Sequence, residues 1–168
     1  MRSVEPAAAA LLLVLVPSAA AAAYDANGVA LGARESAVKE RFPSAHCRPL
    51  EWASLAADRR CDDSRVELGG VKVRVTFYLK KDAVEAFDVR FDTRDLERLL
   101  EVLRKSYGAP VSEGRETVER EGKPARRFYR ALWQSGAERA LLSAELTQRR
   151  ASMLVSRGDF EREIYRVR

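Results

Sequence analysis

The segment from Val71 to Leu79 alternates apolar and polar side chains without interruption, and this pattern restricts the fold more than any other. A period of two over nine residues predicts a β-strand that is buried on one side only. Such a strand needs an apolar cover on one face, so we expect an antiparallel sheet that is covered on a single side. The two expected faces consist of Val71, Val73, Val75, Phe77 and Leu79, and of Lys72, Arg74, Thr76 and Tyr78.

Turn signals place further strands on either side of this segment. Gly69-Gly70 predicts a two-residue hairpin turn after a strand over 65–68. Lys80-Lys81-Asp82 predicts a turn into a returning strand over 84–91. The apolar phase of that strand slips between Ala86 and Phe87, which predicts a β-bulge.

The second half of the chain carries its own strand signals. Apolar alternation predicts strands over 128–133, 140–146 and 151–155, with turns at 134–136 and 148–150. The polar stretch over 109–127 has no clear period, and it is either a loop or a hairpin around Glu121-Gly122. The tail over 159–168 leaves helix and strand both open.

Two segments show helical spacing. In the segment over 33–42, Val38 and Phe42 lie four residues apart, and Pro43 ends the pattern. The second helix starts after a cap at Asp92 or Thr93 and stops at Gly108. Its apolar stripe consists of Leu96, Leu99, Leu100, Leu103 and Tyr107.

These elements predict an α+β fold with two similar halves. The halves span about 24–92 and 93–168, and each contains one helix followed by roughly three antiparallel strands. We therefore predict tandem αβββ repeats that form a curved antiparallel sheet, with two helices packed on one face.

The first 23 residues have the composition of a cleavable signal peptide. Arg2 precedes a ten-residue apolar run over 7–16, Pro17 and Ser18 end this run, and a stretch of alanines follows. A membrane anchor needs about 20 apolar residues, so we expect cleavage after Ala23. The mature chain is then a single domain over 24–168, periplasmic or secreted, that does not span the membrane.

Cys47 and Cys61 are the two cysteines of the chain. An even cysteine count in a small exported domain predicts a disulfide. Closing a loop of about 15 residues stabilises a fold by roughly 3 kcal/mol in the chain-entropy description. Trp52, Leu55 and Ala56 lie at helical spacing between the cysteines, so we expect a short helical lid whose ends the disulfide ties together.

Several short stretches resemble a known family. These are Gly28-Val29-Ala30-Leu31-Gly32, the helix with Val38 and Phe42, Tyr107-Gly108-Ala109-Pro110 and the strand with Trp133. Together they look like the small αβ repeats of outer-membrane assembly lipoproteins and of the β-lactamase-inhibitor-protein fold. The resemblance implies a non-catalytic protein-binding scaffold. The chain departs from the lipoproteins because no cysteine follows the apolar run, so lipid anchoring is not implied.

Known catalytic motifs are missing from the sequence. His46, the single histidine, lies beside Cys47, which we expect to be in the disulfide. Asp58, Asp62 and Asp63 could form a pair of catalytic carboxylates, but a charged surface turn is the simpler interpretation. We expect no enzyme activity, no cofactor and no metal; a hydrolase that uses these aspartates is the least favoured function.

The polar face of the sheet is the best candidate for a binding surface. Tyr, Trp and Arg dominate the energetics of protein interfaces, and several such residues fall on this face or on the lid. The candidates are Lys72, Arg74, Thr76, Tyr78, Arg130 and Trp52, with Tyr129 or Trp133 nearby unless the tryptophan lies in the core.

Charge suggests one further function. The chain has 30 basic and 25 acidic residues, for a net charge of +5. Because acids are scattered among the arginines, we expect no nucleic-acid binding. Our leading hypothesis is a protein partner in the cell envelope, and the alternative is an anionic polymer or lipid head group bound through the arginine excess.

Overall fold

A computed structural model describes residues 24–166 of the chain. The signal peptide predicted over 1–23 lies outside the described residues. The first half contains β1 (Asp25–Ala26), β2 (Val29–Ala30), α1 (Glu35–Arg41), β3 (His46–Pro49), β4 (Arg59–Leu68), β5 (Val71–Lys80) and β6 (Ala83–Phe91). The second half contains a 3₁₀ turn (Thr93–Asp95), α2 (Leu96–Tyr107), β7 (Ser112–Arg120), β8 (Lys123–Ser135), β9 (Glu138–Glu145), β10 (Arg150–Arg157) and α3 (Phe160–Glu163).

Eight strands form one antiparallel sheet, in the order β3-β4-β5-β6-β10-β9-β8-β7. The predicted α+β class is confirmed, but three strands per half is wrong, since four strands follow α1 and four follow α2. The additional strands are β3 and β7. Neither has an alternating apolar face, because β3 is short and every residue of β7 is exposed.

The two-residue turns of the first half form as expected. Gly69 and Gly70 have φ angles of 55° and 82°, and Lys81 and Asp82 have φ angles of 49° and 65°. Both hairpins therefore use the left-handed turn that suits the twist of paired strands. Gly69 has a second reason to be glycine, since a Cβ at this position would lie 2.4 Å from a side-chain methyl of Val102.

One continuous core lies between the sheet and the helices α1 and α2. Val38 of α1 and Leu99 of α2 belong to the same buried cluster as the inward side chains of the strands. Phe42 packs edge-on against Phe77, with ring centroids 4.9 Å apart. Trp133 is 1% exposed and its Nε1 donates to the Gly108 carbonyl at 2.9 Å. Both helices thus cover the same face of the sheet, as predicted.

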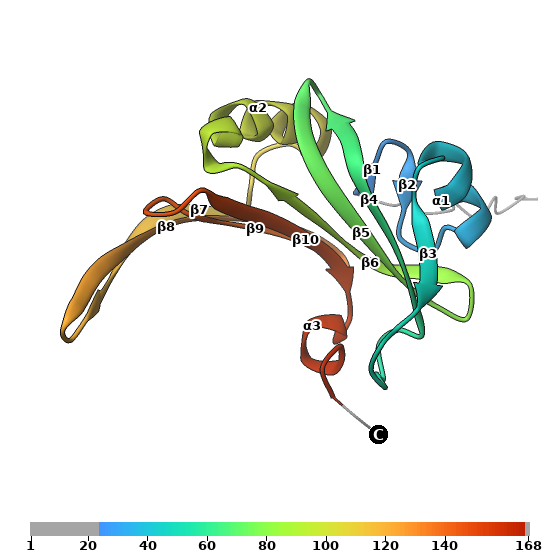
Figure 1. Cartoon of the computed structure of the whole chain (residues 1–168). Helices are drawn as coiled ribbons and strands as arrows, with labels where there is room; N and C mark the ends of the chain where they lie inside the picture. The colour runs from blue at the N-terminus through green and yellow to red at the C-terminus, as the bar shows by residue number, and fades with distance from the viewer. Residues whose placement is uncertain (1–23, 167–168) are drawn as a thin grey trace, which may run out of the picture.

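Irregular pairing bends the first half of the sheet. Tyr78 pairs with Ala86 and Leu79 pairs with Val84, so Glu85 is the extra residue of a β-bulge in β6. The predicted bulge exists, one residue earlier than the sequence phase placed it. In Figure 1 the strands form an arch, with α2 above it and α3 beneath it.

The predicted disulfide is present, but the predicted helical lid is not. Cys47 and Cys61 are directly opposed across β3 and β4 and are bonded to each other. Residues 50–58 between these strands form an irregular loop, which we call the Trp52 loop. The loop contacts the C-terminal segment instead of coiling: Trp52 Nε1 donates to the Ile164 carbonyl at 2.9 Å. A buried disulfide indicates an oxidising compartment.

The C-terminal segment covers one end of the face opposite α1 and α2. Phe160 and Ile164 pack against Tyr78 and Ala86 in a second, smaller apolar cluster. Tyr78 is consequently 9% exposed, so the prediction that it lies on an open surface is wrong. Within residues 24–166 no helix is long and apolar enough to cross a membrane.

Candidate functional site

The face of the sheet opposite α1 and α2 carries a row of polar residues that crosses five strands. We call it the helix-free face, because only the single turn α3 covers one end of it. Arg74 of β5 is opposite Arg90 of β6, and Arg90 is opposite Ser152 of β10. Ser152 is opposite Ser143 of β9, which is opposite Arg130 of β8. Neighbouring strands lie about 4.8 Å apart, so these five side chains form a continuous line. We call it the arginine–serine row.

An apolar row runs beside it on the same face. Leu154 of β10 is opposite Leu141 of β9, which is opposite Leu132 of β8. All three leucines are half-buried. Leu154 packs against the apolar cluster of Phe160 and Ile164, and the remaining surface of this leucine row is not covered by α1 or α2. Leu154 and Ser152 are two residues apart on one strand, which places the two rows about 6.6 Å from each other.

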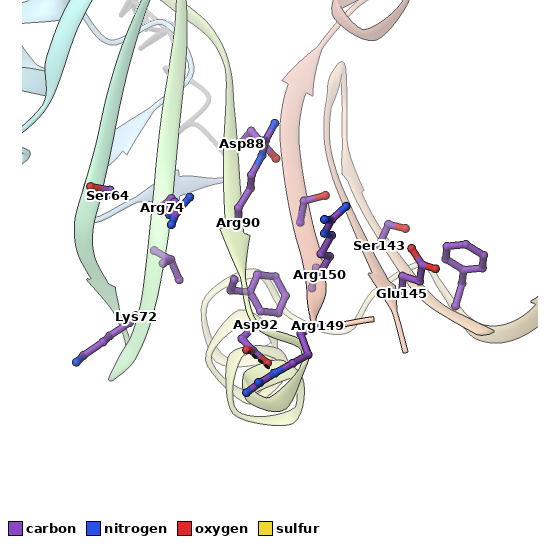
Figure 2. Close-up of a pocket in the computed structure, with 15 residues that line it drawn as sticks. Ser64, Lys72, Arg74, Asp88, Arg90, Asp92, Ser143, Glu145, Arg149 and Arg150 are labelled. Carbon is purple, nitrogen blue, oxygen red and sulfur yellow. Dashed lines mark hydrogen bonds and ion pairs between the residues drawn. The ribbon is translucent and has the colours of Figure 1, made fainter. Parts of the chain in front are cut away.

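A hollow of about 770 Å³ lies along the polar row. Figure 2 shows its lining from β4, β5 and β6 on one side and from β10 and β9 on the other. Its charged lining residues include Lys72, Arg74, Asp88, Arg90, Glu145 and Arg150, and the Phe128 ring adds an apolar surface. We call this hollow the trough.

The acidic residues of the trough are all neutralised by arginines. Asp88 accepts a hydrogen bond from Arg90 Nε at 2.7 Å, and Asp92 forms an ion pair with Arg149 at 3.2 Å. Glu145 accepts two hydrogen bonds from Arg126, at 2.6 Å from Nε to Oε1 and at 2.5 Å from Nη2 to Oε2, in the bidentate geometry that arginine favours.

The basic residues of the trough are not all neutralised. Lys72, Arg74 and Arg150 form no ion pair with any residue between 24 and 166. We call these three residues the free cations because they form no ion pair. Arg150 nevertheless lies directly opposite Glu145, and Lys72 lies directly opposite Glu67, whereas Arg74 lies directly opposite Arg90. The trough therefore has an excess of positive charge that is least compensated at Arg74.

Burial and pairing shift the pKa values of the two acids in opposite directions. Burial raises the pKa of Asp88, and the Arg90 guanidinium offsets part of this effect. Hydrogen bonds from Arg126 hold the pKa of Glu145 below its ordinary value. Glu145 is thus a fixed anion at neutral pH, and its charge is already matched by Arg126.

The structure assembles some of the predicted binding residues and separates others. Lys72 and Arg74 line the trough. Thr76 lies on the same face, where its hydroxyl donates to Asp62 at 2.9 Å. Tyr78 is on this face but is covered by Phe160, and burial raises the pKa of its hydroxyl to about 12.

Of the predicted binding residues on β8 and the Trp52 loop, only Arg130 lies on the polar row of the helix-free face. Arg130 ends the arginine–serine row and forms an ion pair with Glu116 at 3.0 Å. Tyr129 and Trp133 point into the core. Trp52 lies away from the trough, stacked on Tyr165, and with Lys80 and Lys81 it lines a smaller hollow of about 390 Å³.

Several polar residues of the site were missed by the sequence analysis, among them Arg90, Ser143, Arg150 and Ser152. Alternation along β6, β9 and β10 is enough to place their side chains on the polar face. The pairing of β6 with β10 was the missing information, because no local signal indicates which strands of the two halves are neighbours.

The predicted catalytic candidates do not form a site together. Asp62 and Asp63 are consecutive strand residues, so their side chains point to opposite faces of the sheet. Asp62 accepts from Thr76, whereas Asp63 accepts from the Ser44 hydroxyl at 2.7 Å. Asp58 accepts from the backbone N–H of Lys81. Each carboxylate is thus committed to a local hydrogen bond.

His46 and the cysteines show no reactive arrangement. His46 is exposed on β3, opposite Asp62. Glu35 lies within 4.8 Å of the two cysteine sulfurs, but the sulfurs are joined in the disulfide and Glu35 forms hydrogen bonds with Arg59. Both sulfurs are thus held in the disulfide, and the Glu35 carboxylate is held by Arg59.

Comparison with known proteins adds no name to this site. No family model, curated protein or solved structure matches the chain.

Proposed function

We propose that this protein is an exported, non-catalytic binding domain that holds a partner protein on the helix-free face of its sheet. One observation carries the proposal: the arginine–serine row, which contains Arg74, runs directly beside the half-buried leucine row on one face of the sheet. Lys72, Arg74 and Arg150 supply charge, and Leu141 and Leu154 supply apolar area. Protein interfaces combine such residues, with arginine prominent among those that contribute most to affinity.

The lining of the trough favours a protein over a uniform polyanion. Asp88, Asp92 and Glu145 all line the trough, so its positive charge is not continuous, as a polymer or membrane that is negative along its whole length would require. A protein segment can place carboxylates at the free cations and neutral or apolar groups at the remaining positions. Most arginines outside the trough form ion pairs with acidic residues, as Arg130 does with Glu116, and their charge is not available to an external polyanion.

Export is part of the proposal. Residues 1–23 have the pattern of a signal peptide, and the Cys47–Cys61 disulfide fits an oxidising compartment. We propose a periplasmic or secreted location. N-terminal sequencing of the protein purified from its own host is expected to begin at Tyr24, and an intact Met1 would contradict export by cleavage.

The resemblance to the β-lactamase-inhibitor-protein fold and to the repeats of outer-membrane assembly lipoproteins supports the same class of function. Those families are protein-binding scaffolds. We propose that the two halves of this chain descend from one duplicated unit of that kind, in which the β6–β10 pairing joins the last strand of each half.

Affinity capture with matched variants tests the proposed function. The domain over 24–168 is immobilised and exposed to a cell-envelope extract of the source organism. We expect one saturable partner that is lost with Arg74→Glu in the trough and retained with Arg98→Glu on the exposed side of α2. Equal retention by both variants, or no saturable partner, would contradict binding through this face.

A further inference from the structure

Arg74 and Arg90 occupy an unfavourable position relative to each other. They are directly opposite on neighbouring strands, and like charges directly opposite destabilise a sheet. Asp88 lies two residues from Arg90 and forms a hydrogen bond with the guanidinium of Arg90 but not with that of Arg74. Arg74 has no acidic partner among the described residues, so the pair retains one uncompensated positive charge at the centre of the trough.

Hydroxyl donors and further cations surround this pair. Ser152 is the next residue of the row after Arg90. Lys72 lies two residues from Arg74 on β5, and Arg150 lies two residues from Ser152 on β10, so all of them share one face. Figure 2 shows Arg74, Arg90 and Arg150 on three successive strands of the trough. The arrangement provides several N–H and O–H donors for one small anionic group.

We propose that the trough binds an acidic segment of the partner protein, with a carboxylate side chain held between Arg74 and Arg90. This inference rests on the proposed function and names the chemistry of the partner. The Ser152 hydroxyl donates to the same carboxylate, and an apolar side chain of the segment packs on the leucine row at Leu154.

The spacing of the two rows specifies the sequence of the segment. Ser152 and Leu154 are two residues apart on β10, about 6.6 Å. An extended peptide that runs along this strand has the same spacing between alternate side chains. The trough therefore selects a glutamate or aspartate that is two residues from an apolar residue, in either direction along the peptide.

Charge complementarity decides against other anions at this position. The lining of the trough alternates free cations with the ion-paired acids Glu145 and Asp92, so it matches a single carboxylate better than a continuous polyphosphate or an anionic membrane. The leucine row also requires an apolar group at a fixed distance from the anion, which a free phosphate does not provide.

Fluorescence anisotropy with labelled peptides tests the inference. The probe contains Glu-Ser-Leu-Ser repeats, and the control peptide replaces each Glu with Gln. We expect the Glu peptide to bind about tenfold more tightly, because a charge-assisted hydrogen bond is lost in the control. Arg74→Gln should remove this preference, and Arg98→Gln should leave it intact, with thermal unfolding showing that both variants fold.

Several outcomes would overturn the inference. These are no binding of the Glu peptide, equal binding of the Gln peptide, and a preference that survives Arg74→Gln. Displacement of the peptide by polyphosphate or by phosphatidylglycerol vesicles at lower charge concentration would assign the trough to a polyanion or a membrane instead.

The proposed function can survive this failure. If the natural partner is still captured through the helix-free face but Arg74→Gln and the Glu peptide do not affect capture, the face binds protein by other contacts. If no partner depends on this face, both the inference and the proposed function fail.

Discussion

Arg74 occupies a position where we expect its charge to destabilise the sheet. The residue is exposed, and it faces Arg90 directly across the sheet. Each cation on such a face normally has an opposite charge nearby, as Arg130 has in Glu116 and Arg126 has in Glu145. A position that breaks this local rule is expected where function, and not stability, selects the residue.

Arg74→Thr is therefore expected to stabilise the protein. Removing one of two opposed like charges, with a β-branched replacement that suits a strand, should raise the free energy of unfolding by about 0.2–1 kcal/mol. Urea unfolding checks this value. Arg130→Thr is the matched control and should give no gain, since it breaks the pair with Glu116; a loss of stability with Arg74→Thr would contradict the repulsion.

The Arg126–Glu145 pair predicts a pH dependence. Because hydrogen bonds from Arg126 lower the pKa of Glu145, this pair stabilises the fold above the ordinary glutamate value of 4.5 and the effect disappears as the pH falls through the lowered pKa. Glu145→Gln should be less stable than the natural protein at neutral pH, and the difference should shrink on acidification. Urea unfolding across a pH series measures it, and a constant difference would contradict the assignment.

Among the secondary-structure elements, the type and position of β5 and α2 could be predicted from the sequence, whereas those of β7 could not. Along most of its length β5 has one buried face and one solvent-exposed face, so the alternation of apolar and polar residues identifies it as a strand. β7 forms the edge of the sheet and is exposed on both sides, and its position is set by hydrogen bonds to β8 that leave no apolar pattern. The open choice over 109–127 is settled as a hairpin, with its turn at Gly122.

The Trp52 loop failed as a helix prediction for a related reason. Its apolar residues contact the C-terminal segment, more than 100 positions away in the chain, as the bond from Trp52 to Ile164 shows. Helical spacing within the loop carried no information about that distant partner. Local periodicity identifies which residues are buried, but here it misidentified the element that buries them.

The disulfide is expected to stabilise the edge formed by β3 and β4. Cys47 and Cys61 close a loop with a sequence separation of 14, for which the chain-entropy description gives about 3 kcal/mol. Unfolding of Cys47→Ser/Cys61→Ser should show a loss of this order, and a non-reducing peptide map of the natural protein should show the linked peptides. An unchanged midpoint would contradict a structural role.

At the scale of the whole molecule, the trough lies where the two halves meet. β6 ends one four-stranded unit and β10 ends the other, and their pairing brings Arg90 beside Ser152. Alternation along β5 was enough to select Lys72 and Arg74 from the sequence. The remaining half of the site depends on contacts between the halves, which one-dimensional patterns do not encode.

The central claim is that a partner binds the helix-free face where β6 of the first half pairs with β10 of the second half. A nuclear magnetic resonance titration of the isotope-labelled domain with the Glu-Ser-Leu-Ser peptide tests it most directly. We expect amide shift changes concentrated at Arg74, Arg90, Ser152 and Leu154, with α1 and α2 unaffected. Shifts confined to the helices or to the Trp52 loop, or no shifts at saturating peptide, would contradict the account.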